Sequence, residues 1–106
     1  MLKDNRPAGD GAAPLHLAPE EARLFERLTR TYRFDDAASL ELLTQAMEAR
    51  CRARLCREQV EKDGQTVRDD RGNLKAHPLL ATERSAQASF LSAMRLLRLD
   101  LTGSAK

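Results

Sequence analysis

The sequence predicts an all-α protein: a short N-terminal helix followed by a long antiparallel helical hairpin, with a small β-hairpin or extended connector between the two long helices. Three observations predict this class. The chain has 106 residues, enough for one small domain. It contains 17 Leu and 16 Ala, both good helix formers. It has only two Val, four aromatic residues, no Ile and no Trp, so it lacks the side chains that pack the faces of a large sheet.

The N-terminal region predicts a flexible arm over residues 1–18 and a first helix over about 19–32. Prolines and single glycines interrupt any helical period in the arm. Pro19 suits the first position of a helix, and the two glutamates that follow it oppose the positive end of the helix dipole. One face of this helix is apolar and consists of Phe25, Leu28 and Tyr32.

A long second helix is predicted from residue 37 to about residue 63, on the order of 40 Å in length. Either Asp35 or Asp36 can cap its start, because a carboxylate accepts a hydrogen bond from a backbone N–H of the first turn. Gly64 supplies the stop.

Two apolar stripes run along this second helix, which implies more than one packing partner. Small residues allow close backbone approach, and a chain of this size has little core to offer, so we expect one stripe to face another copy of the chain. The alternative is that the first helix covers the second stripe within one chain. The stripe predicted as the oligomer interface, called the small-residue seam below, is Leu42, Ala46, Ala49, Ala53, Cys56 and Val60; the second stripe is Leu40, Leu43, Met47, Cys51 and Leu55.

The connector, residues 64–78, lacks a helical pattern and is predicted to form a short hairpin or an extended loop. Residues 66–68 and 74–76 flank a turn in which Asp69 comes early and Gly72 late, the pattern of a hairpin built on a type I turn with a glycine bulge. His77 is interpreted as a structural loop or cap residue, held extended by Pro78.

The last helix is predicted from about residue 78 to residue 99. Residues 19–101 then form one helical domain, followed by a short polar tail over 102–106. The core stripe of this helix is Leu79, Ala86, Phe90, Ala93 (with Met94) and Leu97.

The charge balance is mildly basic, with a formal net charge of +2. This permits contact with nucleic acid without requiring it. Among the cations, 14 are Arg and four are Lys, and Arg is favoured where planar contact with phosphate or carboxylate matters. The candidate DNA contacts are Arg68, Arg71 and Lys75 in the connector and Arg84, Arg95 and Arg98 along one stripe of the last helix.

Two other interpretations of these cations stay open. The stripe on the last helix is also consistent with a solvated face or with ion pairs to a neighbouring subunit. A similar row on the second helix, Arg50, Arg54 and Arg57, is expected to be solvated or neutralised by local pairs, Arg54 with Glu58 and Arg57 with Glu61.

The sequence shows no pattern of catalytic, metal-binding or cofactor-binding residues, so we expect no enzymatic activity, no metal and no cofactor. The glycines are scattered singly, without a phosphate-binding loop. Cys51 and Cys56 are five residues apart on a predicted helix and point about 140° away from each other, which prevents a disulfide between them. The chain has no apolar run long enough to span a membrane and no secretion signal, so we expect a cytoplasmic protein with no membrane contact.

Two ordered motifs carry a resemblance to a known family. Residues 61–67 read E-x-x-G-x-T-V, residues 72–78 read G-x-x-K-x-H-P, and a Leu-rich helix follows. This order resembles the small subunit of tailed-phage terminases, in the branch typical of cohesive-end long-tailed phages and their prophages, over about residues 18–104. The chain departs from the family pattern at its C-terminal end, where Asp100 replaces a Gly and Gly103 replaces a Pro.

The resemblance implies a non-catalytic, ring-forming homo-oligomer in the host cytoplasm. It implies binding of double-stranded viral DNA at the packaging start site and delivery of that DNA to the terminase large subunit, which carries the ATPase and the nuclease. Two other classes remain open: a small helical transcriptional regulator, and a helical protein-interaction module without a nucleic-acid role. A regulator needs a recognition helix for the major groove, and the second helix looks too long and too alanine-rich for that role.

Overall fold

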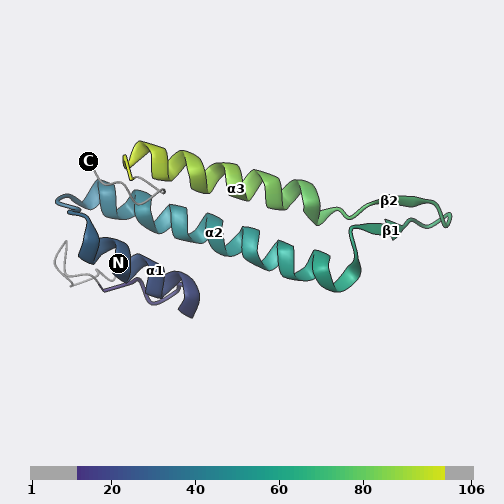
Figure 1. Cartoon of the computed structure of the whole chain (residues 1–106), viewed down its shortest axis with the longest axis horizontal. Helices are drawn as coiled ribbons and strands as arrows, with labels where there is room; N and C mark the ends of the chain where they lie inside the picture. The colour runs from purple at the N-terminus through teal and green to yellow at the C-terminus, as the bar shows by residue number, and fades with distance from the viewer. Residues whose placement is uncertain (1–11, 100–106) are drawn as a thin grey trace, which may run out of the picture.

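The computed structural model of the chain describes residues 12–99 and shows three helices and one two-stranded antiparallel sheet (Figure 1). This confirms the predicted helical class with a small β-hairpin between the two long helices. In chain order the elements are α1 (Pro19–Thr31), α2 (Ala37–Asp63), β1 (Thr66–Arg68), β2 (Leu74–Ala76) and α3 (Leu79–Leu96).

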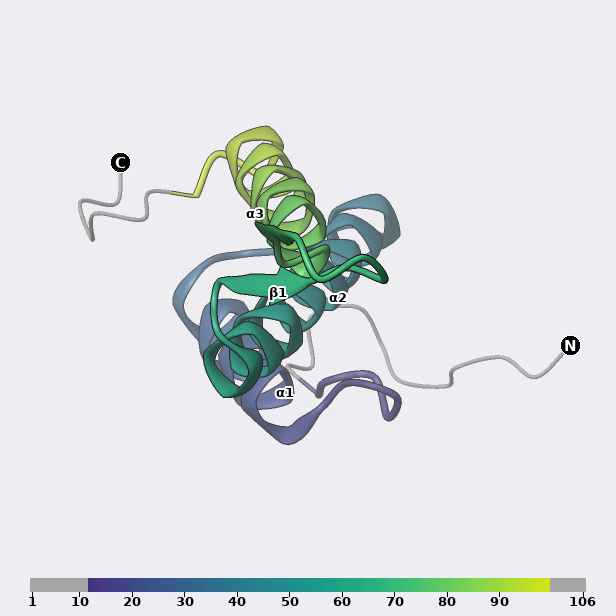
Figure 2. The same ribbon diagram turned by 90° about the vertical axis from the view of Figure 1, so that its right-hand side faces the viewer.

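The central element is α2, with α3 packed antiparallel along one side of it and α1 along the other (Figure 1). The end-on view also places α1 and α3 on different sides of α2 (Figure 2). The main core lies where α1 and α3 both reach the first half of α2. Its buried members are Ala13, Phe25, Phe34, Leu43, Ala46, Met47, Ala93 and Met94.

Both apolar stripes of α2 are largely covered within the chain, although Leu55 of the second stripe is 52% exposed. Leu43 and Met47 of the second stripe are fully buried in the core that contains Phe25 of α1, which agrees with the alternative that α1 covers this stripe. Five members of the small-residue seam are buried as well: Ala46, Ala49, Ala53, Cys56 and Val60. Only Leu42 remains half-buried.

This burial shows that most of the small-residue seam, predicted as a contact between copies, packs within one chain. The periodicity identified a buried face of α2, but α3 and the core residues of the same chain cover it. The small side chains let α2 and α3 approach closely along their length. Leu42 and Ala49 of the seam also line an open groove between α2 and α3.

The ends of α2 lie where the sequence predicts them. The carboxylate of Asp36 caps the start, with its Oδ1 accepting a hydrogen bond from the backbone N–H of Ser39 at 3.3 Å. At the other end Gly64 has φ +90° and ψ 157°, a conformation open essentially to glycine, and its N–H donates to the carbonyl of Val60 at 2.7 Å. The chain leaves the helix there and turns into β1.

The β-hairpin extends beyond the helices at the far end of the molecule (Figure 1). Its register pairs Thr66 with Ala76, and Arg68 with Leu74. In the turn, the N–H of Gly72 donates to the carbonyl of Asp69 at 3.0 Å, and Gly72 has φ +83°. This confirms the predicted turn with a glycine bulge.

His77 joins the end of α2 to the start of α3. It is buried, its Nδ1 accepts a hydrogen bond from the backbone N–H of Leu79 at 3.1 Å, and its Nε2 lies 2.8 Å from Oδ2 of Asp63. A neutral ring with its proton on Nε2 satisfies both contacts. The prediction of a structural role for His77 is confirmed.

The last helix is shorter than predicted, because α3 ends at Leu96 and not near residue 99. Leu97 is its C-cap, and Arg98 follows with φ +62°. The N–H of Leu99 donates to the carbonyl of Met94 at 3.1 Å, and the N–H of Arg98 to that of Arg95 at 3.0 Å. These two bonds form a Schellman motif, with Arg98 at the position that usually holds glycine.

Residues 12–18 pack against the helices, so the predicted flexible arm over 1–18 does not hold for this part. Ala13 is buried in the core, and its N–H donates to Oε2 of Glu26 at 3.4 Å. The imidazole of His16 lies 2.7 Å from the carboxylate of Glu48. Residues 1–11 and the predicted tail over 102–106 lie outside the described residues.

Candidate nucleic-acid interface

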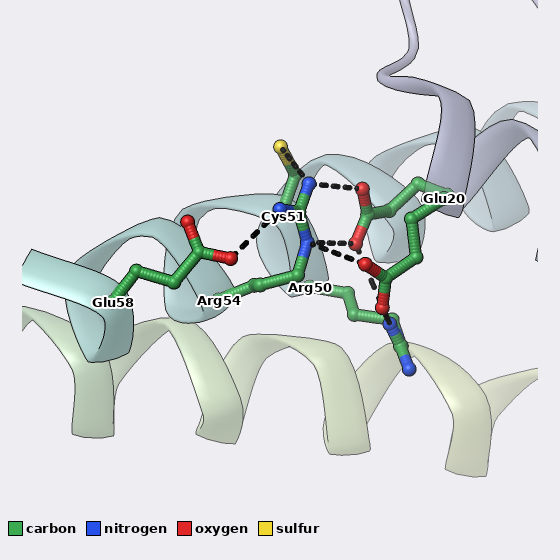
Figure 3. A network of polar contacts seen from close by, with 6 residues as sticks. Glu20, Arg50, Cys51, Arg54 and Glu58 are labelled. Carbon is green, nitrogen blue, oxygen red and sulfur yellow. Dashed lines mark hydrogen bonds and ion pairs between the residues drawn. The ribbon is translucent and has the colours of Figure 1, made fainter. Parts of the chain in front are cut away.

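Ion pairs between α1 and α2 engage two of the three arginines of the row on α2 (Figure 3). The carboxylate of Glu21 is fully buried and receives two hydrogen bonds from Arg54, Nη2 to Oε1 at 2.8 Å and Nε to Oε2 at 3.1 Å. Arg50 lies 3.4 Å from the same carboxylate. Glu20 adds longer pairs with both arginines, and Arg54 also pairs with Glu58 at 3.3 Å, as predicted.

This network holds α1 against α2 and fixes the charge of Glu21. The hydrogen bonds from Arg54 hold the pKa of the Glu21 carboxyl below its ordinary value, against the opposing effect of burial. Glu21 in turn raises the pKa of Arg54. Arg50 and Arg54 are thus engaged by carboxylates of this chain and do not form a free basic surface.

The third arginine of that row contacts α3. Arg57 donates two hydrogen bonds to Glu83, Nε to Oε2 at 3.0 Å and Nη2 to Oε1 at 2.9 Å, and Gln87 donates a third at 3.1 Å. Glu83 is 5% exposed. The pair predicted between Arg57 and Glu61 is replaced by this contact.

The buried glutamates Glu21 and Glu83 were not among the sequence candidates, although a signal for each is present. Glu21 precedes Phe25 and Leu28 at spacings of 4 and 3, which places it on the apolar face of α1. Glu83 stands between Leu79 and Ala86 at the same spacings on α3. A carboxylate at a core position of a helix predicts an arginine partner on the neighbouring helix, because an unpaired buried charge is strongly unfavourable.

The outer face of α3 carries the predicted stripe of cations. Arg84, Arg95 and Arg98 are all exposed, and none forms an ion pair within residues 12–99. Glu83 is the one acidic residue of α3, and it points at Arg57. The stripe therefore has no carboxylate beside it on its own helix. Arg84 and Arg95 are about 16 Å apart along the axis, and Arg98 follows just past the helix end.

The hairpin cations lie in a more mixed environment. Arg71 and Lys75 are exposed and share a shallow depression at the turn with Asp69 and Asp70. Arg68 donates a hydrogen bond from Nη1 to the carbonyl of Gly72 at 2.6 Å, so this guanidinium stabilises the turn. The six predicted cations thus form two separate groups. One is the stripe on α3, which has no neighbouring carboxylate on its helix, and the other is a partly neutralised group at the hairpin tip.

Residues 12–99 contain no cluster of three or more His, Cys, Asp or Glu side chains that could hold a metal ion. Cys51 and Cys56 are both free cysteines. No helix within the described part of the chain is long and apolar enough to span a membrane.

Together these features define a small helical protein in which buried Glu21 and Glu83 pair with arginines of α2, while the arginines of the α3 stripe are exposed. Comparison with known families then identifies it. The chain belongs to the family described as phage terminase, small subunit, which it matches over residues 22–106. This confirms the family suggested by the two ordered motifs. No curated protein and no solved structure matches the chain.

Proposed function

We propose that this protein is the non-catalytic, oligomeric adaptor of a phage packaging machine. In this role it binds double-stranded viral DNA at the packaging start site, in the host cytoplasm, and brings the terminase large subunit to it. The observation that carries the proposal is the outer face of α3, where Arg84, Arg95 and Arg98 are exposed without a carboxylate partner in residues 12–99.

Exposed guanidinium groups with no internal partner attract the phosphates of DNA. Such contacts position a protein on the duplex and are independent of base sequence. Arg71 and Lys75 at the hairpin tip add two further cations, close enough to Asp69 and Asp70 to be weaker contributors. A few contacts for each chain give weak binding, and repetition of the same surface around an oligomer raises the overall affinity.

The surface that we propose for the contact between copies is a groove between α2 and α3 that no residue of α1 lines. Its apolar part is built from small side chains on both helices, flanked by Leu42 and by Leu96, which is 71% exposed. The groove is lined by Leu42, Gln45, Glu48, Ala49, Arg52, Ala88, Ser89, Ser92, Ala93 and Leu96. A second copy that inserts aliphatic side chains there removes this exposed leucine from water.

The position of α2 argues against a transcriptional regulator. In a helix-turn-helix protein the second helix is the one that enters the major groove. Here α2 lies between α1 and α3, which cover two of its faces along the chain (Figures 1 and 2). Its remaining exposed face carries only two cations to meet the phosphates that flank a major groove: it consists of Glu41, Gln45, Arg52, Leu55, Gln59 and Lys62.

DNA binding is tested with linear duplex DNA by fluorescence anisotropy over a range of salt concentrations. We expect the logarithm of the binding constant of the wild type to fall linearly with the logarithm of salt, and the slope to shrink by about two for R84Q/R95Q. The control K62E changes the net charge by the same two units at one exposed position of α2, which carries no ion pair within residues 12–99 and lies outside the groove, and it should leave the slope nearly unchanged.

Light scattering on the same samples tests the oligomer. A mass that corresponds to several chains at micromolar concentration supports the proposal. A monomer at all these concentrations, together with no salt-dependent DNA binding, contradicts it. A stable oligomer that does not bind DNA points instead to a protein-interaction module.

A further inference from the structure

We infer that the outer face of α1 is a second phosphate-contacting surface for duplex DNA, formed by Arg23, Arg27 and Arg30. This inference rests on the proposed function, because it assigns a further binding surface to a protein proposed to bind DNA. It concerns a different helix from the one that carries the α3 stripe (Figure 1).

The first step is the separation of charge on α1. The helix has three glutamates and three arginines. All three glutamates are engaged inside the chain: Glu20 and Glu21 by Arg50 and Arg54 of α2, and Glu26 by the backbone N–H of Ala13. No glutamate of α1 is paired with an arginine of its own helix.

The second step is the state of the three arginines. Arg23, Arg27 and Arg30 are exposed, and none forms an ion pair or a side-chain hydrogen bond within residues 12–99. A helix of six charged residues usually neutralises itself through pairs three or four positions apart. In α1 the carboxylates that would do this are turned toward α2 and the first residues described, so the outer face is left purely cationic.

The third step is geometry. The spacings of 4 and 3 place the three arginines on one face, about 6 Å and about 4.5 Å apart along the axis. Each strand of DNA carries one phosphate per about 3.4 Å of duplex axis. A row about 10 Å long therefore spans several phosphates of one strand. The arginine side chains are long and flexible, so they can adjust to the difference between their own spacing and that of the phosphates.

The row is also held in place. Phe25 on the inner face of α1 is 4% exposed, and the paired contacts of buried Glu21 with Arg54 fix the rotation of α1 about its axis. A charged row on a rigid helix loses less entropy on binding than the same charges on a loop. This distinguishes α1 from the hairpin, where Arg71 and Lys75 stand beside carboxylates.

The placement of α1 and α3 on different sides of α2 has a consequence for DNA (Figures 1 and 2). The α1 row and the α3 stripe are separate surfaces, although Glu20 of α1 and Phe90 of α3 border one hollow over α2. The α1 row therefore adds phosphate contacts to those of the α3 stripe.

The test uses the full chain and compares R27Q/R30Q with the charge-matched control K62E and with R27K/R30K, which keeps the charge. Salt-dependent binding to linear duplex DNA is measured as above, and the helical content and mass of each variant are checked by circular dichroism and light scattering. We expect the slope to shrink by about two for R27Q/R30Q only. The lysine variant should keep most of the wild-type slope.

Three results overturn the inference, and each is distinguishable from failure of the proposed function. Equal slopes for R27Q/R30Q and the control, with R84Q/R95Q still impaired, remove α1 from the DNA surface and leave the proposed function standing. A change in oligomer mass with an unchanged slope makes the row a contact between copies. Loss of binding to the purified large subunit with an unchanged slope makes it a docking surface for that protein. A wild type that shows no salt-dependent binding contradicts both proposals.

Discussion

Glu21 shows how one residue determines where a whole helix lies. Its carboxylate is completely buried, and its two hydrogen bonds from Arg54 are the closest polar contacts between α1 and α2. An uncharged residue at this position leaves the guanidinium without its buried partner. The two helices are then held mainly by the apolar contacts around Phe25.

The variant E21Q should lower the free energy of unfolding at neutral pH by about 1–3 kcal/mol, because a hydrogen bond to a charged group is lost in a buried site. Urea unfolding followed by circular dichroism measures this. The control E58Q removes the exposed partner of Arg54 and should cost less than about 0.5 kcal/mol. Equal effects of the two variants would show that burial of Glu21 is not what strengthens its contact.

The pH dependence follows from the lowered pKa of Glu21 in the folded state. A carboxylate with a lowered pKa stabilises the fold above its unfolded pKa, near 4.5, and loses that contribution as the pH falls through the folded pKa. The difference in stability between wild type and E21Q should therefore be full at pH 6–7 and shrink below about pH 4. A constant difference down to pH 3 would contradict this.

At position 98 the stability of the helix end favours glycine, whereas the proposed DNA contact needs the arginine. It has φ +62° at the end of α3, where glycine fits without strain. The variant R98G should raise the free energy of unfolding by about 0.5–1 kcal/mol and reduce the salt slope of DNA binding by about one. The control R98K keeps the charge and the strain, so both quantities should stay near the wild type. A loss of stability in R98G would mean that the arginine itself supports the helix end.

At the scale of elements, the small-residue seam of α2 is the surface that the structure reassigns. The periodicity of Leu and Ala located the buried face, and the bounds of α2 and of the hairpin also follow from local signals such as Asp36, Gly64 and Gly72. What local signals do not contain is the identity of the covering element. Whether Ala46 or Ala53 meets α3 or another copy depends on how the connector folds back, which no single segment of sequence determines.

The seam can be tested by overpacking. The variant A46L adds three carbon atoms at a fully buried position and should lower the free energy of unfolding by about 1–3 kcal/mol. The control A81L makes the same change at an exposed position of α3 and should stay within about 0.5 kcal/mol. Thermal unfolding measures both. If A46L instead split the oligomer without loss of stability in the separated chains, the seam would lie between copies after all.

Some exposed, unpaired cations can be identified from the sequence and others cannot. The α3 stripe was visible because no carboxylate stands three or four positions from Arg84, Arg95 or Arg98 in the chain. Arg23 and Arg30 were not visible as free cations, since Glu20 and Glu26 lie three or four positions away on the same helix. Their freedom depends on Arg50 and Arg54, which come about 30 residues later and attract two of the α1 glutamates. Such a distribution of partners is a property of the tertiary structure.

At the scale of the whole molecule, the largest buried side chains gather at one end. Leu43, Met47 and Met94 belong to the core around the first half of α2, whereas the half of α2 near the hairpin buries mainly Ala53, Cys56 and Val60. A core of this size gives a single chain little stability. Association of copies should therefore contribute to the stability of the folded state.

The midpoint of thermal unfolding should then rise with protein concentration, since mass action favours a folded oligomer over unfolded chains. Calorimetry over a hundredfold range of concentration measures this, with light scattering to follow the mass. The variant S89W, in the groove between α2 and α3, should weaken the concentration dependence by blocking the proposed contact. A midpoint independent of concentration would show that the single chain is stable by itself.

The β-hairpin has a consequence for local dynamics. All of β2 is exposed, and no helix packs on either face of the ribbon. A two-stranded ribbon with no apolar cover is only marginally stable. Its amide hydrogens should exchange with solvent much faster than those in the middle of α2, through openings that leave the helices intact. Slower amide exchange of residues 66–76 would then show that a partner has bound at that end, even where exchange in the helices is unchanged.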